Sequence, residues 1–90
     1  MELLGVVKKI MQENQVSASF KTRELIVATD EQYPQQISVQ FAQDKCAILD
    51  NYKVGDAVTV GINLRGREWT DPQGSVKYFN TIGGWSIKKT

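Results

Sequence analysis

The chain of 90 residues is long enough for one compact domain and too short for two domains of ordinary size. Its 41% hydrophobic and 23% charged residues exclude a disordered or fibrous protein, and no apolar run approaches the ~20 residues of a membrane span. The formal net charge is +1, and the absence of histidine removes the commonest general base and metal ligand. We therefore expect one soluble domain that is not an enzyme and has no cofactor or metal site.

The N-terminus and the single cysteine indicate a cytoplasmic location. Glu2 stands where a secretory signal has a basic residue, and no apolar run follows it. Cys46 has no partner for an internal disulfide, as is usual in a reducing compartment. Because no histidine is present to activate its thiol, we expect Cys46 to pack in the core.

The first half of the chain predicts three strands, over residues 3–11, 20–29 and 37–42, because apolar and β-branched residues are concentrated there. Asn14 and Asp30 mark breaks between these strands.

A short helix is predicted next, over residues 43–51. Cys46 and Leu49 are three residues apart, and Ile48 and Tyr52 are four apart. This spacing allows one side of the helix to face a core.

The clearest strand covers residues 57–69. Val58, Val60, Ile62 and Leu64 alternate with polar or small residues, so we expect this row to face the core.

A turn and a returning strand follow. Residues 71–74 have Asp first, Pro second and Gly fourth, which is typical of a type I turn. Residues 76–87 then form the second strand of a long hairpin, and Gly83-Gly84 suggests a bulge or a barrel corner within it.

The resulting order is β-β-β-α-β-β over a single domain of residues 1–90. An all-β barrel of five strands, with one helix between the third and the fourth, is the layout of the OB-fold, which binds oligonucleotides or oligosaccharides. A five-stranded SH3-like barrel is the nearest alternative, but it does not need a helix at that position.

The hairpin resembles bacterial single-stranded DNA-binding proteins. That family has a strand ending in Leu-Arg-x-Arg-x-Trp followed by Thr-Asp, and residues 64–71 match this motif. The resemblance covers roughly residues 37–82. The whole chain resembles more closely a family of short bacterial proteins of unknown function, which begin Met-Glu-Leu-x-Gly, as residues 1–5 do, and carry the motif found here at residues 30–35.

The resemblance to the DNA-binding family implies nucleic-acid contacts for residues at three places. On the hairpin they are Arg65, Arg67, Trp69, Lys77 and Tyr78. On the third strand it is Phe41, which matches a phenylalanine that stacks on a base. The family's second stacking aromatic lies six residues earlier, where this chain has Gln35.

The residue pattern adds to these candidates and also offers alternatives. Arg65, Arg67 and Trp69 share one side of the strand, whereas Tyr78 and Phe79 point to opposite faces, so at most one of the last two belongs to any one site.

Lys21 and Arg23 border the second strand and would extend a basic face. The alternatives are packing: Phe41 shares its parity with core residues, Trp69 can pack within the hairpin, and Trp85 fits a barrel end or a subunit contact.

Two functions from different classes remain open. The first is sequence-nonspecific binding of single-stranded nucleic acid, DNA before RNA, by a homodimer or homotetramer. This binding requires cations for phosphates and aromatic faces for bases. The second is a protein-interaction or structural OB domain whose exposed aromatic residues contact a protein partner. No membrane partner is expected.

Overall fold

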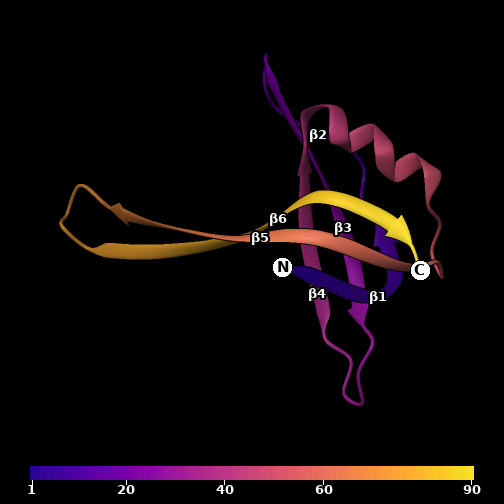
Figure 1. The fold of residues 1–90 in the computed structure, drawn as a ribbon. Coiled ribbons are helices and arrows are strands. Elements are labelled where there is room, and N and C mark those ends of the chain that lie inside the picture. The colour runs from indigo at the N-terminus through magenta and orange to yellow at the C-terminus, as the bar shows by residue number, and fades with distance from the viewer.

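The computed structural model describes all residues, 1–90, as six strands and one 3-10 helix. The elements in chain order are β1 (Glu2–Ile10), β2 (Asn14–Ser17), β3 (Phe20–Thr29), β4 (Gln36–Ala42), η1 (Gln43–Asn51), β5 (Ala57–Thr70) and β6 (Val76–Lys89). All strands belong to one sheet (Figure 1).

Five of these strands close into a barrel. Strand β1 pairs antiparallel with β5 through its first half and with β3 through its second half. Strand β3 pairs with β4, β5 pairs with β6, and a short parallel contact between Gln40 of β4 and Gly83 of β6 completes the circuit. The predicted five-stranded OB-fold with a helix before the fourth barrel strand is therefore confirmed.

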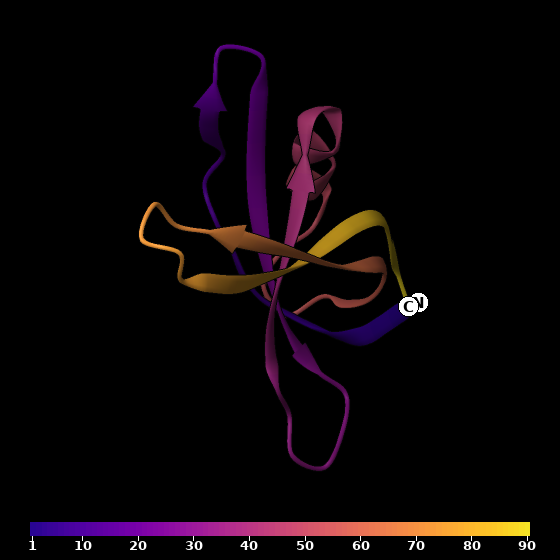
Figure 2. The ribbon, with the colours of Figure 1, turned by 90° about the vertical axis from the view of Figure 1, so that its left-hand side faces the viewer.

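Strand β2 was not expected from the sequence. It pairs only with the beginning of β3, so the two strands form a hairpin that projects from the barrel (Figures 1 and 2). All four residues of β2 are exposed, and without a buried face the segment has no apolar alternation that would signal a strand. Asn14, predicted to be a break, is its first residue.

The core consists of alternate residues on the inner faces of the barrel strands. Nine buried apolar side chains form one cluster: Val7, Leu25, Val27, Val39, Phe41, Leu49, Val58, Val60 and Ile62. The predicted inward row of β5 is thus confirmed as far as Ile62. Leu64, predicted to continue it, is 67% exposed, because β5 has left the barrel at that point.

The predicted helix is present at residues 43–51 but is a 3-10 helix. Its three residues per turn align Cys46, Leu49 and Tyr52 on one side. The first two are buried, and the Tyr52 hydroxyl donates a hydrogen bond to the Ile87 carbonyl at 2.9 Å. Ile48, predicted to face the core, is 38% exposed because the tighter helix turns it away. No helix in the structure has the length and apolar character to cross a membrane.

The far halves of β5 and β6 form a hairpin that extends well beyond the barrel, and we call residues 63–82 the arm (Figures 1 and 2). Its turn is built as predicted. The amide of Gly74 donates to the carbonyl of Asp71, and the Asp71 side chain accepts from the amides of Gln73 and Ser75. Gly74 has φ of +89°, a conformation that favours glycine.

The predicted irregularity near Gly83-Gly84 is also present. The pairing of β5 with β6 shifts by one residue at this point, which leaves Trp85 as the extra residue of a bulge. Gly84 faces the ring of Phe41, and a Cβ atom at Gly84 would lie only 2.5–2.8 Å from three ring carbons. Glycine is therefore required where β6 crosses the core.

Replacing Gly84 by alanine should destabilise the fold. The added methyl group meets the fully buried Phe41 ring, and overpacking of this kind costs ~1–3 kcal/mol. Urea unfolding of Gly84→Ala measures the loss. The matched control is Gly83→Ala, whose Cβ would come no closer than 3.5 Å to the Arg65 side chain and should change stability by less than ~0.5 kcal/mol. Equal losses in the two variants would contradict the packing described here.

Candidate nucleic-acid interface

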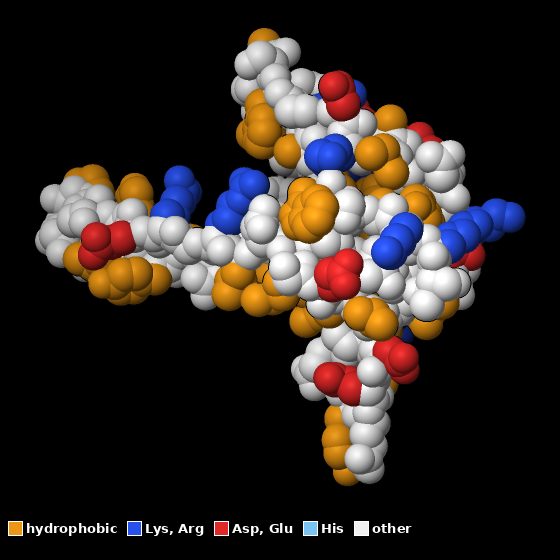
Figure 3. Space-filling view, viewed as in Figure 1, with side chains coloured by type: hydrophobic (Ala, Val, Ile, Leu, Met, Phe, Trp, Pro, Cys, Tyr) orange, Lys and Arg blue, Asp and Glu red, His pale blue; other side chains and the backbone are white.

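The two faces of the arm differ in chemistry. In an antiparallel pair, directly opposed residues share a face, and alternate residues along each strand share it too. The cross-strand pairs then define a cationic face, formed by Arg65, Arg67, Trp69, Lys77, Phe79 and Thr81. The pairs between them define the opposite face, which carries no cation and which we call the apolar face for its exposed Leu64, Val76 and Tyr78. It also contains Gly66, Glu68, Thr70, Asn80 and Ile82. Figure 3 shows Lys and Arg side chains along one side of the arm only, whereas the other side is mostly hydrophobic apart from an acidic group.

Two cations of the cationic face contact aromatic rings on the opposite strand. The Arg67 guanidinium carbon lies 5.7 Å from the centre of the Phe79 ring, and the Lys77 ammonium lies 5.9 Å from the Trp69 ring. None of the arm's cations has a carboxylate partner, since the three salt bridges of the structure involve other residues. Their positive charges are therefore free for a ligand.

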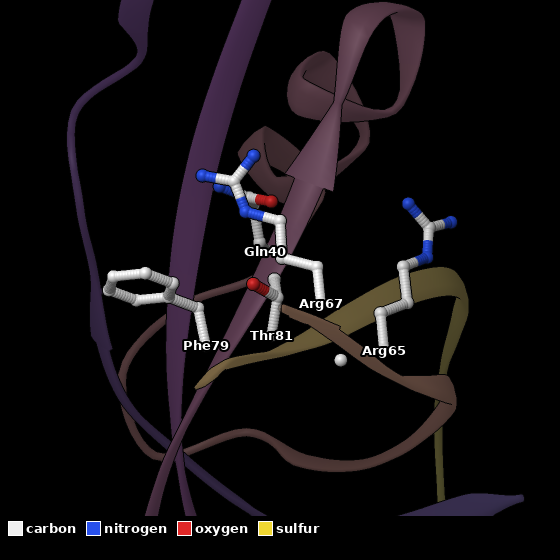
Figure 4. Close-up of a pocket in the computed structure, with 6 residues that line it drawn as sticks. Gln40, Arg65, Arg67, Phe79 and Thr81 are labelled. Carbon is white, nitrogen blue, oxygen red and sulfur yellow. The ribbon is translucent and has the colours of Figure 1, made fainter. Parts of the chain in front are cut away.

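A hollow of about 400 Å³ lies where this face meets β4. Its walls are Gln40, Arg65, Gly66, Arg67, Phe79 and Thr81. In Figure 4 the two guanidinium groups point to the same side of the hairpin, with the Phe79 ring and the Gln40 amide at the Arg67 end. The hollow thus offers two cations, one aromatic ring and one amide to a single ligand.

The prediction that Arg65, Arg67 and Trp69 share an outer face is confirmed, and Lys77 joins them. Tyr78 does not. It lies on the apolar face, where its hydroxyl contacts Glu68 Oε1 at 3.3 Å.

Phe79, not Tyr78, is the aromatic residue beside the arginines, and the length of the loop explains the error. A two-residue loop would pair Arg67 with Tyr78, whereas the pairing of Asp71 with Ser75 leaves three residues in the loop and pairs Arg67 with Phe79. A shift of one residue exchanges the faces of a strand. The turn sequence, with Gly in the left-handed conformation, is the signal that would have indicated this register.

Phe41 has no accessible surface, so its assignment as a base-stacking residue is wrong for this structure and the alternative of core packing holds. The strand pairing explains why. Phe41 has the same orientation as Val39, and both point into the barrel, where Phe41 contacts Gly84 of β6.

The expected contribution of Arg23 to a basic surface is also wrong. Its Nε donates to the Met11 carbonyl at 2.8 Å, and its Nη1 binds the Cys46 carbonyl at 3.2 Å and Asp50 Oδ1 at 2.7 Å. These contacts hold η1 and the end of β1 against β3. Lys21 forms a salt bridge of 3.5 Å with Glu13 and lies outside the cationic face.

Trp85 is an outward-facing aromatic residue that the sequence interpretation assigned to packing or to a subunit contact. It is 48% exposed, and its ring lies over Gly61, where a side chain would collide with it. The Lys45 ammonium donates to the Trp85 carbonyl at 2.8 Å. The Arg65 side chain lies against Gly83 on the same outer surface. Trp85 therefore continues the line of exposed aromatics from the arm onto the barrel.

Cys46 packs in the core, as predicted. It is fully buried, and burial raises the pKa of its thiol, so the protonated form dominates at neutral pH. Since the thiolate is the reactive form, this shift lowers the reactivity of the Cys46 thiol. No group of three or more metal-ligating side chains is present.

The closed barrel of five strands, with a helix before the fourth and an arm formed by the last two, defines an OB-fold protein of the kind seen in single-stranded DNA-binding proteins. The chain itself belongs to the family described as Domain of unknown function (DUF3127), whose model matches residues 2–88.

Two of the many solved chains that share this fold come from one protein. Both are mitochondrial single-stranded DNA-binding proteins from S. cerevisiae, Rim1 (Form2), one of them labelled with selenomethionine. They superpose with TM-scores of 0.75 and 0.74 at 15% and 13% sequence identity, and each match covers 99% of this chain and 91% of the other. Comparison of the sequence with curated proteins gives no significant match.

Removing the Arg23 side-chain contacts should destabilise the domain. Arg23→Met keeps the aliphatic stem but removes hydrogen bonds to two backbone carbonyls and Asp50, which should cost ~1–3 kcal/mol. Chemical unfolding measures the change. Arg65→Met makes the same substitution on the exposed arm and should stay within ~0.5 kcal/mol of the parent. A stable Arg23→Met protein would show that Arg23 is not a structural residue.

Proposed function

We propose that this protein binds single-stranded nucleic acid, DNA in the first instance, without requiring a fixed sequence. The observation that carries the proposal is the cationic face, where three cations without a carboxylate partner lie together with two exposed aromatic rings beside a hollow. The fold shared with two single-stranded DNA-binding proteins supports it.

The chemistry of the face suits a flexible strand. Guanidinium groups bind phosphate oxygens through paired N–H donors and also stack on planar groups. Aromatic rings stack on any base, because every base has a π face. On the arm, Arg65, Arg67 and Lys77 supply the charge, while Trp69 and Phe79 supply the rings. A duplex hides its base faces, so this arrangement favours a single strand.

Assembly into a homodimer or homotetramer is part of the proposal. The apolar face of the arm leaves Leu64 67% and Tyr78 73% exposed, and a two-stranded hairpin is marginally stable unless something packs on it. Like charges keep two cationic faces apart, so the apolar faces of two copies are the surfaces that can meet. Each copy then presents its cationic face outward.

Light scattering tests this assembly. A dimer or larger species should appear at tens of micromolar, and Leu64→Glu should return the mass to the 10.1 kDa of one chain, because a buried carboxylate is unfavourable. Thr70→Glu places the same charge on the same face nearer the tip and serves to map how far the contact extends. A parent protein of 10.1 kDa would contradict assembly.

Neighbouring aromatic residues on opposite faces of the arm give a matched test of binding. Phe79→Ala should weaken binding of oligo-dT by ~1–3 kcal/mol through loss of a stacking surface. Tyr78→Ala, one residue earlier but on the other face, should leave the affinity unchanged in a protein that light scattering shows to keep the mass of the parent. Titration of tryptophan fluorescence at low salt, with circular dichroism to check folding, measures both variants.

The salt dependence of the same titration separates the two functional classes. Each phosphate contact to a single strand contributes ~0.7 to the slope of log K against log salt, so Arg67→Gln should reduce the slope by about that amount. Lys89→Gln removes the same charge at the opposite end of β6, where Lys89 faces Asp56, and should leave the slope unchanged. No binding of oligo-dT or of an RNA oligomer at low salt would favour the protein-interaction function instead.

A further inference from the structure

Glu24 and Gln40 form an outward-facing pair at the foot of the arm. They are directly opposed in the pairing of β3 with β4. Their neighbours Leu25 and Val39 are fully buried, so Glu24 and Gln40 point out of the barrel. Gln40 is also the residue of β4 that pairs with Gly83 of β6, which places the Glu24–Gln40 pair beside the base of the arm.

Three hollows of the surface meet at this pair. Gln40 lines the hollow of about 400 Å³ that contains the two arm arginines and Phe79. Gln40 and Glu24 together line a second hollow of about 280 Å³, bordered by the β2–β3 hairpin, and a third of about 430 Å³, bordered by Leu64 and the end of the arm nearest the barrel. The Glu24–Gln40 pair therefore adjoins the hollow at the barrel end of the cationic face.

The chemistry of this pair differs from that of the arm. The Glu24 side chain is exposed and takes part in no salt bridge of the structure. A carboxylate repels phosphate and only accepts hydrogen bonds, so a nucleotide beside it must present donors. The edges of cytosine, adenine and guanine carry an exocyclic amino group that is such a donor, whereas thymine has carbonyl oxygens on both sides of its single N–H.

We propose that Glu24 and Gln40 contact base edges and give the protein a preference for bases with an exocyclic amino group, cytosine over thymine above all. This inference rests on the proposed function. The arm arginines hold the phosphates, Phe79 stacks on one base, and the next base lies with its edge at the pair. Glu24 accepts from the amino group, and the Gln40 amide supplies one donor and one acceptor for the rest of that edge.

Two pyrimidine oligomers test the preference. Oligo-dC and oligo-dT of equal length are both pyrimidine strands, and they differ in the hydrogen-bonding edge of the base and in the 5-methyl group of thymine. Competition titrations at pH 8, where cytosine is not protonated, should show ~5–10-fold tighter binding of oligo-dC, the lower end of what one specific base contact supplies. Glu24→Gln should bring the ratio of the two affinities close to one, because an amide can both donate and accept hydrogen bonds and therefore binds the edge of either base.

Glu68→Gln is the matched control, since it removes the same charge from the apolar face of the arm. This variant should either raise the affinities for oligo-dC and oligo-dT by the same factor or leave both unchanged. The ratio of the two affinities is preserved in either case. If neither oligomer binds the parent protein, the proposed function fails. If both bind with equal affinity, or if Glu24→Gln keeps the preference, the base-edge role is overturned while nucleic-acid binding stands.

Discussion

The contact between the Phe41 ring and Gly84 is the constraint on which the site depends. Closing the barrel requires β6 to pass directly over a fully buried aromatic ring, which only a residue without a side chain permits. That crossing sets the short parallel pairing of Gln40 with Gly83. The pairing in turn fixes the base of the arm against β4, so the arginines of β5 and the amide of β4 line one hollow.

The loop at the end of the arm is the second constraint. Asp71 and Gly74 build a three-residue loop whose length determines which residues of β5 and β6 oppose each other. Because side chains alternate along a strand, the register decides the chemistry of each whole face. Here it gathers the arm's cations on one face with Trp69 and Phe79, and leaves no cation on the other face.

The arm shows how binding and stability compete. The core provides most of the packing, and its nine buried apolar residues all belong to the barrel and η1. The arm has only its ladder of hydrogen bonds and its cross-strand contacts, which include the two pairs of cation and ring. Exposed aromatic residues and unpaired cations add little to folding, but these are the groups that a ligand can use.

The sequence by itself determined the order of the five barrel strands and the helix, the hairpin with its Asp-Pro-Gln-Gly turn, and the shared face of Arg65, Arg67 and Trp69. These features follow from local alternation and turn chemistry, which act over a few residues. Only the tertiary structure decided what depends on closing the barrel. It buried Phe41 beneath β6, engaged Arg23 under η1, exposed Leu64 where β5 leaves the core, and brought Gln40 to the arm. Each of these outcomes depends on which distant strand packs over a residue. The pattern of residues along one strand does not specify that neighbour.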